Sequence, residues 1–268
     1  MASKYRPWID ALRESNAHLA EFLGTPDGVD VASATYCPGW SVAHLLRHFG
    51  SGAEIGLLNL RGALSADEPP PRSLYGEIIA AWASKPEERL AQEALARNDL
   101  YVDTLDALDD DSLDALRVRL RGRDLDVAAF VGRRLFEHAL HTWDIEVMRN
   151  PLAVLTPEAA TLLVDRVIAN LDMLSGGRGT VSPPVRVGVS IEDSGKAFIL
   201  EAGPEAVNLE AAGLELASLR SSAEAFVRLL SGRLDVNHTP ASLIASPDEV
   251  LEQLRGIFAG VPTPTEPA

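Results

Sequence analysis

The stretch Phe130-Val-Gly-Arg-Arg-Leu-Phe-Glu-His-Ala-Leu-His-Thr-Trp-Asp-Ile-Glu-Val-Met148 decides how this chain is interpreted. At about 100° per residue, a helix over this stretch carries one stripe of titratable side chains, namely Arg134, Glu137, His141 and Asp144. On an ordinary surface helix such a stripe faces solvent. Here the flanking and opposite positions are mostly apolar or small, which is typical of a buried helix. Buried charged groups must be paired or bind a metal, so the stripe is a candidate site.

Glu137 and His141 have the spacing of two metal ligands. They are four residues apart, so their side chains project in one direction from consecutive turns and can reach the same ion. A third ligand must come from another element, and a second predicted helix offers His44 and His48, also four residues apart. His138 points about 100° away from Glu137 and is a weaker candidate. From spacing alone, His44 and His48 remain alternatives.

The composition argues against several classes of partner. The chain has 39 acidic and 24 basic residues, a formal net charge of -15. This charge repels phosphate backbones and anionic lipid headgroups, so we expect neither nucleic acid nor a membrane as partner. No apolar run is long enough to span a bilayer, and the first residues lack the pattern of a signal peptide. Cys37 is the only cysteine, so we expect a cytoplasmic protein without an intramolecular disulfide.

The periodicity of apolar residues changes along the chain. Helical spacing predicts long helices at about residues 6–23, 41–61 and 125–149, with further helical segments between residues 72 and 108 and from Pro157 onward. A Gly-, Ser- and Pro-rich segment then precedes alternating residues that predict strands at 185–191, 196–201 and 206–211. Two amphipathic helices are predicted at 222–230 and 247–258. We therefore predict an α+β protein with a helical bundle at 1–178, a small α+β domain at 179–262 and a flexible tail at 263–268.

Two segments carry a resemblance to a known family. Cys37-Pro-Gly-Trp-Ser-Val-Ala-His-Leu-Leu-Arg-His-Phe-Gly50 resembles the signature segment of the mycothiol-dependent maleylpyruvate isomerase family, part of the DinB-like superfamily. The pattern Glu-x-x-x-His-x-Trp-Asp at 137–144 and the small C-terminal domain follow in the family's order, although the connecting helices resemble it only loosely. The resemblance implies a DinB-like four-helix bundle followed by a sterol-carrier-like α+β domain.

The resemblance also implies a ligand set. In that family a histidine of the first motif and the Glu and His of the second hold a divalent ion, usually zinc. These positions fall on His48, Glu137 and His141. The resemblance thus selects His48 as the third ligand and leaves His44 as a candidate substrate-binding residue.

Three further residues are candidates for supporting roles. Asp144 and Arg134 lie on the ligand face and are candidate catalytic residues that support the metal or contact the substrate, although Asp144 is equally suited to local pairing. In the family an arginine of the second domain can face the substrate, and Arg220 is the candidate here. Cys37, which precedes a Pro-Gly turn and has no basic neighbour in sequence, is predicted to be a buried structural residue.

Three protein ligands leave an open position, as in catalytic zinc sites. A thiol bound there loses its proton near neutral pH and becomes the nucleophilic thiolate. The resemblance therefore implies an enzyme, a monomer or homodimer, that activates mycothiol for S-transfer to a small electrophile or for thiol-assisted isomerisation. We favour S-transfer because no residue demands a dicarboxylate. The alternatives are maleylpyruvate isomerase proper, a metal hydrolase, or a non-enzymatic small-molecule binding protein whose structural metal has a fourth ligand such as His44.

Overall fold

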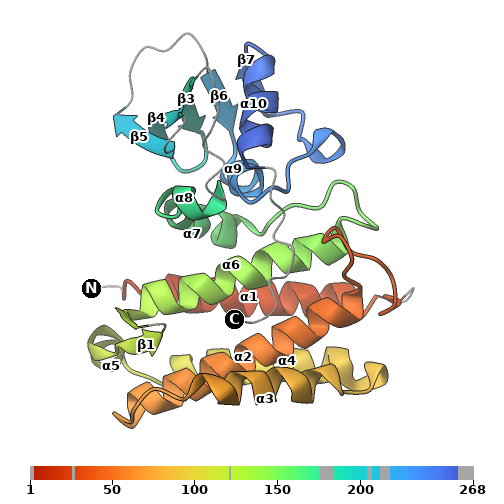
Figure 1. Cartoon of the computed structure of the whole chain (residues 1–268), viewed down its shortest axis with the longest axis vertical. Helices are drawn as coiled ribbons and strands as arrows, with labels where there is room; N and C mark the ends of the chain where they lie inside the picture. The colour runs from red at the N-terminus through yellow and green to blue at the C-terminus, as the bar shows by residue number, and fades with distance from the viewer. Residues whose placement is uncertain are drawn as a thin grey trace. The chain divides into compact units, whose positions relative to one another are not determined.

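The computed structural model has two compact units and describes residues 3–25, 28–120, 122–175, 184–203, 207–211 and 218–258. The main parts of the units are Met1–Arg149 and Asn150–Glu266. The first is mainly helical and the second contains a five-stranded sheet, which confirms the predicted α+β class (Figure 1). The predicted domain boundary between residues 178 and 179, and the predicted tail, lie outside the described residues.

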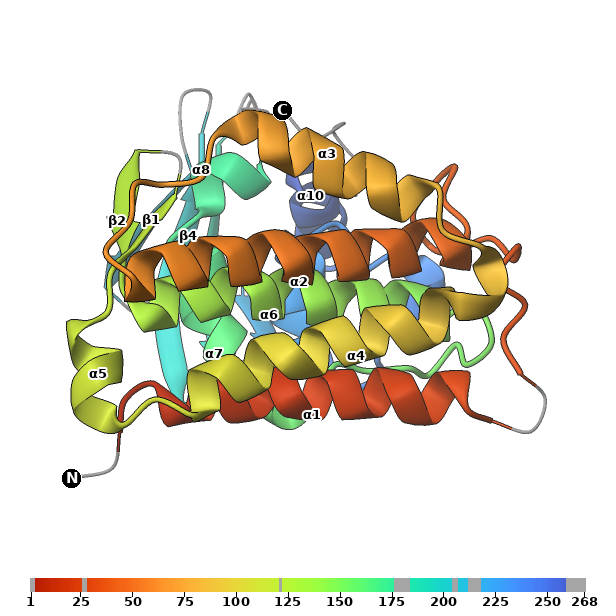
Figure 2. The ribbon, with the colours of Figure 1, turned by 90° about the horizontal axis from the view of Figure 1, so that it is seen from below.

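In the described part of the first unit, six helices and a short hairpin form the fold. They are α1 (Arg6–Leu23), α2 (Val42–Leu64), α3 (Arg72–Ala83), α4 (Glu87–Asp106), α5 (Asp110–Ala115), β1 (Val118–Leu120), β2 (Arg123–Leu125) and α6 (Val127–Glu146). Figure 2 shows α1, α2, α4 and α6 running alongside one another, with α3 next to α2. α1 packs on α4 and α6, and α2 packs on the same two helices, so the four close into a bundle.

Most predicted helices of this unit form close to their expected bounds. α1 matches its predicted range, and α2 begins directly after Ser41, which is its N-cap. α2 continues through Gly62 to Leu64, because a glycine inside a packed helix costs only about 1 kcal/mol. The β1–β2 hairpin was not predicted, since strands of three residues are too short to show an alternating pattern.

The second unit places helices on a mixed sheet. Its helices are α7 (Pro157–Ile168), α8 (Leu171–Leu174), α9 (Ala223–Leu230) and α10 (Glu249–Ile257), and its strands are β3 (Val185–Ile191), β4 (Lys196–Ala202), β5 (Val207–Ala211), β6 (Ser218–Ser221) and β7 (Ile244–Ser246). The strand order is β5-β4-β3-β6-β7, with β3 and β6 parallel and the other pairs antiparallel. Every second side chain of β3 is buried, which is the alternation that predicted this strand. Across the described residues, no helix is both long and apolar enough to cross a bilayer.

The first turn of α6 is held by a side-chain cap. Asp126 precedes the helix, and its carboxylate Oδ1 accepts a hydrogen bond from the Ala129 amide at 2.8 Å. Asp126→Ala is expected to lower the free energy of unfolding by about 1 kcal/mol in urea denaturation, because this amide has no partner within the helix. Asp126→Ser keeps an acceptor and should stay close to wild type. An equal loss in both variants would argue against the cap.

An ion pair between α1 and α6 makes stability depend on pH. His18 Nε2 lies 2.8 Å from Glu146 Oε2, and this hydrogen bond raises the pKa of His18 above its ordinary value of 6.5. The ion pair contributes its full stabilisation at pH values below the unfolded-state pKa of His18. This contribution is lost as the pH rises through the folded-state pKa of His18. Wild type should therefore exceed His18→Gln in unfolding free energy by more at about pH 6 than at about pH 9. A difference independent of pH would contradict this assignment.

Candidate metal centre

The side chains of His48, Glu137 and His141 converge between α2 and α6. His48 Nε2 lies 3.4 Å and His141 Nε2 lies 3.5 Å from the same carboxylate oxygen, Glu137 Oε2. One donor atom from each residue lies within 4.8 Å of the other two. The structure thus brings together the three predicted ligands from two helices. Two imidazole nitrogens and a carboxylate oxygen form a donor set that suits zinc, so these residues fit a divalent ion.

The cluster is closed on one side and open on the other. The side chain of His141 is 9% exposed, whereas those of His48 and Glu137 are 35% and 38% exposed. A small molecule can therefore approach from the side of His48 and Glu137. This asymmetry is what a catalytic centre needs, because a reactant must reach the ion.

The surroundings of His48 and Glu137 favour the protonation states that bind a metal, a neutral imidazole and an ionised carboxylate. Burial lowers the pKa of His48, which favours the neutral imidazole. Burial opposes ionisation of Glu137, but hydrogen bonds with His141 and His48 outweigh it and hold the pKa of this carboxyl well below its usual range. Burial likewise opposes protonation of His141, yet Asp144, Cys37 and Glu137 together raise its pKa to about 10.

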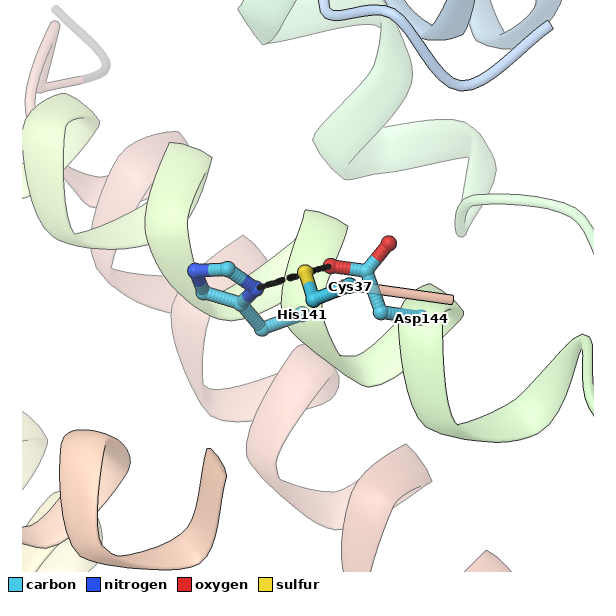
Figure 3. Close-up of side chains that lie close together, drawn as sticks. All are labelled: Cys37, His141 and Asp144. Atoms are coloured by element: carbon cyan, nitrogen blue, oxygen red, sulfur yellow. Dashed lines mark hydrogen bonds and ion pairs between the residues drawn. The ribbon is translucent and has the colours of Figure 1, made fainter. Parts of the chain in front are cut away.

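A second cluster shares His141. Asp144 Oδ2 lies 2.8 Å from His141 Nδ1 and accepts a hydrogen bond from the Cys37 thiol at 3.1 Å (Figure 3). Cys37 Sγ lies 3.8 Å from His141 Nδ1, and all three residues are buried. One donor atom from each of these three residues also lies within 4.8 Å of the other two. Cys37 is buried as predicted, but sequence reasoning missed its contact with Asp144. The available signal was their position in the sequence: Cys37 is the first residue of the first motif segment, and Asp144 is the last residue of the second.

Other histidines near the ligands have different partners. His44 is exposed, and its Nδ1 accepts from the Ser41 amide at 3.3 Å and lies 2.9 Å from the Ser41 hydroxyl in a capping box. His138 is fully buried, with its Nδ1 2.8 Å from the Ser15 hydroxyl. Neither joins the ligand cluster. Of the two histidines that spacing left open, the structure brings His48 and not His44 to Glu137.

The indole ring of Trp40 lies beside the cluster of His48, Glu137 and His141. Its ring centroid lies 5.7 Å from that of His48 and 6.2 Å from that of His141, and its ring stacks at 6.3 Å on His44. The residue is only partly buried. Trp143, by contrast, is fully buried in the core. Trp40 therefore lies where it can shield a reactant from water.

Arg134 connects three helices beneath the site. It is buried, and its Nη2 donates to the Phe49 carbonyl at 2.7 Å and to Asn98 Oδ1 at 2.6 Å. Gly52 leaves room for the guanidinium, since a Cβ there would lie 2.7 Å from Nη1. Burial lowers the pKa of Arg134 to about 10, so it stays cationic at neutral pH. Arg134 thus fixes α6 against α2 and α4 next to the ligands.

Arg220 lies in the second unit, on β6. Its side chain is 57% exposed and forms an ion pair with Glu192. Arg228 and Arg233, from the same sequence segment, are almost completely buried, and Arg228 is paired with Glu224. Arg220 is thus the accessible arginine among these three.

Comparisons with known proteins agree with the sequence resemblance. A family described as the mycothiol maleylpyruvate isomerase N-terminal domain matches residues 12–146. Two solved structures, the crystal structure of the mycothiol-dependent maleylpyruvate isomerase and that of a mutant of it, each match with a TM-score of 0.60 and 17% identity. Each match covers 92% of this chain and 96% of that chain, so the likeness of fold includes both units. Comparison with curated protein sequences finds no match.

Proposed function

The chain belongs to the mycothiol maleylpyruvate isomerase family, and from this premise we propose that it is an enzyme that activates a thiol with a divalent ion. The ligands would be His48, Glu137 and His141, the ion zinc, and the thiol mycothiol. The observation that carries the proposal is the convergence of these three donors with one side open to a small molecule. When bound, the ion would supply Lewis acidity that lowers the pKa of a coordinated thiol.

The protein side chains would prepare the site for an anionic sulfur. Glu137 stays ionised and contributes one negative charge, while His48 is held neutral by burial. Arg134 stays cationic and supplies positive charge next to the ligands. Trp40 covers one side of the cluster and limits access of water. A nucleophilic sulfur is more reactive where it is poorly hydrated, so Trp40 would favour attack of the thiolate on the second reactant.

Two residues are proposed to recognise the reactants. His44 Nδ1 accepts the Ser41 amide proton, which places the remaining ring proton of a neutral His44 on Nε2, available to donate to a substrate. Arg220 would bind an anionic part of a reactant, because its exposed ion pair with Glu192 contributes little and can be exchanged. Asp144 and Arg134 would act from behind the ligands, on the geometry of the site.

We favour S-transfer to a small electrophile over isomerisation. Both reactions begin with addition of the thiolate to an electrophilic carbon. In transfer the sulfur stays on the product, and in isomerisation its elimination restores the thiol after rotation about the former double bond. The chain would work on diffusible reactants as a monomer or homodimer. A reducing compartment such as the cytoplasm would suit the reduced thiol of Cys37, the only cysteine of the sequence.

The decisive experiment combines the metal-loaded protein, mycothiol and a panel of small electrophiles, followed by mass spectrometry. We expect adducts whose formation requires protein, metal and thiol together. A product of unchanged mass with full recovery of thiol, above all from maleylpyruvate, would instead identify an isomerase. Turnover without thiol would favour a hydrolase. Tight binding of an apolar molecule with no turnover would favour a binding protein. Each of the last two results contradicts the proposal.

A further inference from the structure

We propose that Asp144 and Cys37 are positioning residues for His141. The Asp144 carboxylate holds the imidazole through Nδ1–H, and the Cys37 thiol holds that carboxylate. His141 then presents Nε2 toward Glu137 and His48. This inference deepens the proposed function, on which it rests, because it assigns two residues that act on the ligand set without belonging to it.

The hydrogen-bond geometry identifies the donor and acceptor atoms. Asp144 Oδ2 is 2.8 Å from His141 Nδ1 and 3.1 Å from Cys37 Sγ, so one carboxylate oxygen faces two donors (Figure 3). A carboxylate can only accept, which requires a proton on Nδ1 and on the thiol. His141 Nε2, on the other side of the ring, lies 3.5 Å from Glu137 Oε2. The ring is therefore fixed at Nδ1, and Nε2 is the nitrogen available to an ion.

The burial of these groups makes the arrangement rigid. Asp144 is 0% exposed, and Cys37 is 1% exposed. The Asp144 carbonyl also accepts a hydrogen bond from the Tyr36 amide at 2.9 Å, so backbone and side chain both tie the 36–37 segment to α6. The Trp40 amide in turn donates to the Cys37 carbonyl at 3.1 Å. The contact that orients His141 thus also anchors the turn that carries Trp40.

A different use of the same atoms is a second metal site, made of Cys37, His141 and Asp144. The geometry argues against it. Separations of 2.8 and 3.1 Å to one oxygen are ordinary hydrogen-bond distances. They are shorter than the ~3.3 Å that separates two N or O ligand atoms of a tetrahedral zinc ion. The three residues are all buried, which leaves no open position for a reactant. A carboxylate that receives the free N–H of a metal-binding histidine is the common supporting arrangement in metal centres.

The test measures affinity for Zn²⁺ in the full-length protein by competition with a chromophoric chelator. Asp144→Asn is expected to weaken binding about 10- to 100-fold, the usual effect of losing such a carboxylate. Cys37→Ala should weaken it less, and Cys37→Ser, which keeps a donor, should lie closest to wild type. Glu146→Gln is the matched control, because it removes an acid from the same helix that contacts His18 instead. It should bind Zn²⁺ like wild type.

A second readout needs no ion. In the metal-free protein, NMR should detect a slowly exchanging, downfield Nδ1–H proton of His141 in wild type and in Cys37→Ser. In Asp144→Asn this signal should shift upfield or exchange faster, while circular dichroism and thermal unfolding report whether the variant is folded. If wild type binds no Zn²⁺, the proposed function fails, whereas the proton signal still tests the hydrogen bond.

Three results would overturn the positioning role. One is a folded Asp144→Asn protein with wild-type Zn²⁺ affinity. Another is an unaltered Nδ1–H signal in that variant. The third is a second equivalent of bound Co²⁺ with a thiolate charge-transfer band that Cys37→Ser abolishes, which would make the buried cluster a metal site.

Discussion

Replacing His48 with alanine is expected to weaken binding of Zn²⁺ by more than about 100-fold, beyond the loss caused by removing a supporting residue. His48 is the ligand that α2 contributes, 3.4 Å from the Glu137 carboxylate. Without it, the remaining two ligands come from one helix, and the ion loses the donor that links α2 to α6. Chelator competition on purified protein measures the affinity, and thiol-dependent turnover should fall in parallel.

His44→Ala is the matched control for this prediction. It removes a histidine one turn earlier on the same helix, whose Nδ1 is engaged by Ser41. We expect its Zn²⁺ affinity to remain within a few-fold of wild type, with a modest loss of stability from the damaged cap. If His48→Ala retains wild-type affinity, or if His44→Ala loses as much, the ligand set is wrong.

Part of the site could be predicted from the sequence because helical geometry is local. The four-residue spacing of Glu137 and His141 places both on one face wherever the helix packs. The choice between His44 and His48 is not local, since it depends on which turn of α2 faces α6. The spacing left both open, and the family resemblance selected His48. Cys37 and Asp144 are 107 positions apart, so no periodicity indicates their contact.

The elements of the fold that could be predicted are likewise those whose pattern is local in the sequence. Long helices and the alternating strand Val185–Ile191 were predicted, because each carries a repeated pattern over several residues. β1, β2 and β7 were missed, since each has three residues and forms only through pairing with another segment. The contact between Gly52 and the Arg134 guanidinium could not be predicted either, because it depends on where that guanidinium lies in the packed bundle.

Gly50→Ala is expected to destabilise the protein by about 1–3 kcal/mol, although alanine favours helices more than glycine does. Gly50 lies inside α2, and a Cβ built on it would be 2.1 Å from two atoms of the Trp82 ring. Trp82 is 2% exposed and donates from Nε1 to Glu54 at 2.9 Å, so its ring has little freedom to move. Urea denaturation with unchanged m-value would measure the loss.

The same substitution at Gly76 should have the opposite sign. Gly76 lies inside α3, is exposed, and has no heavy atom within 4 Å of the position that a Cβ would take. Alanine there only improves helix propensity, so Gly76→Ala should gain up to about 1 kcal/mol. Two glycine-to-alanine changes in neighbouring helices thus separate packing from propensity. Wild-type stability in Gly50→Ala would show that Trp82 does not pack against α2 as described, and a loss of stability in Gly76→Ala would contradict the open space at that position.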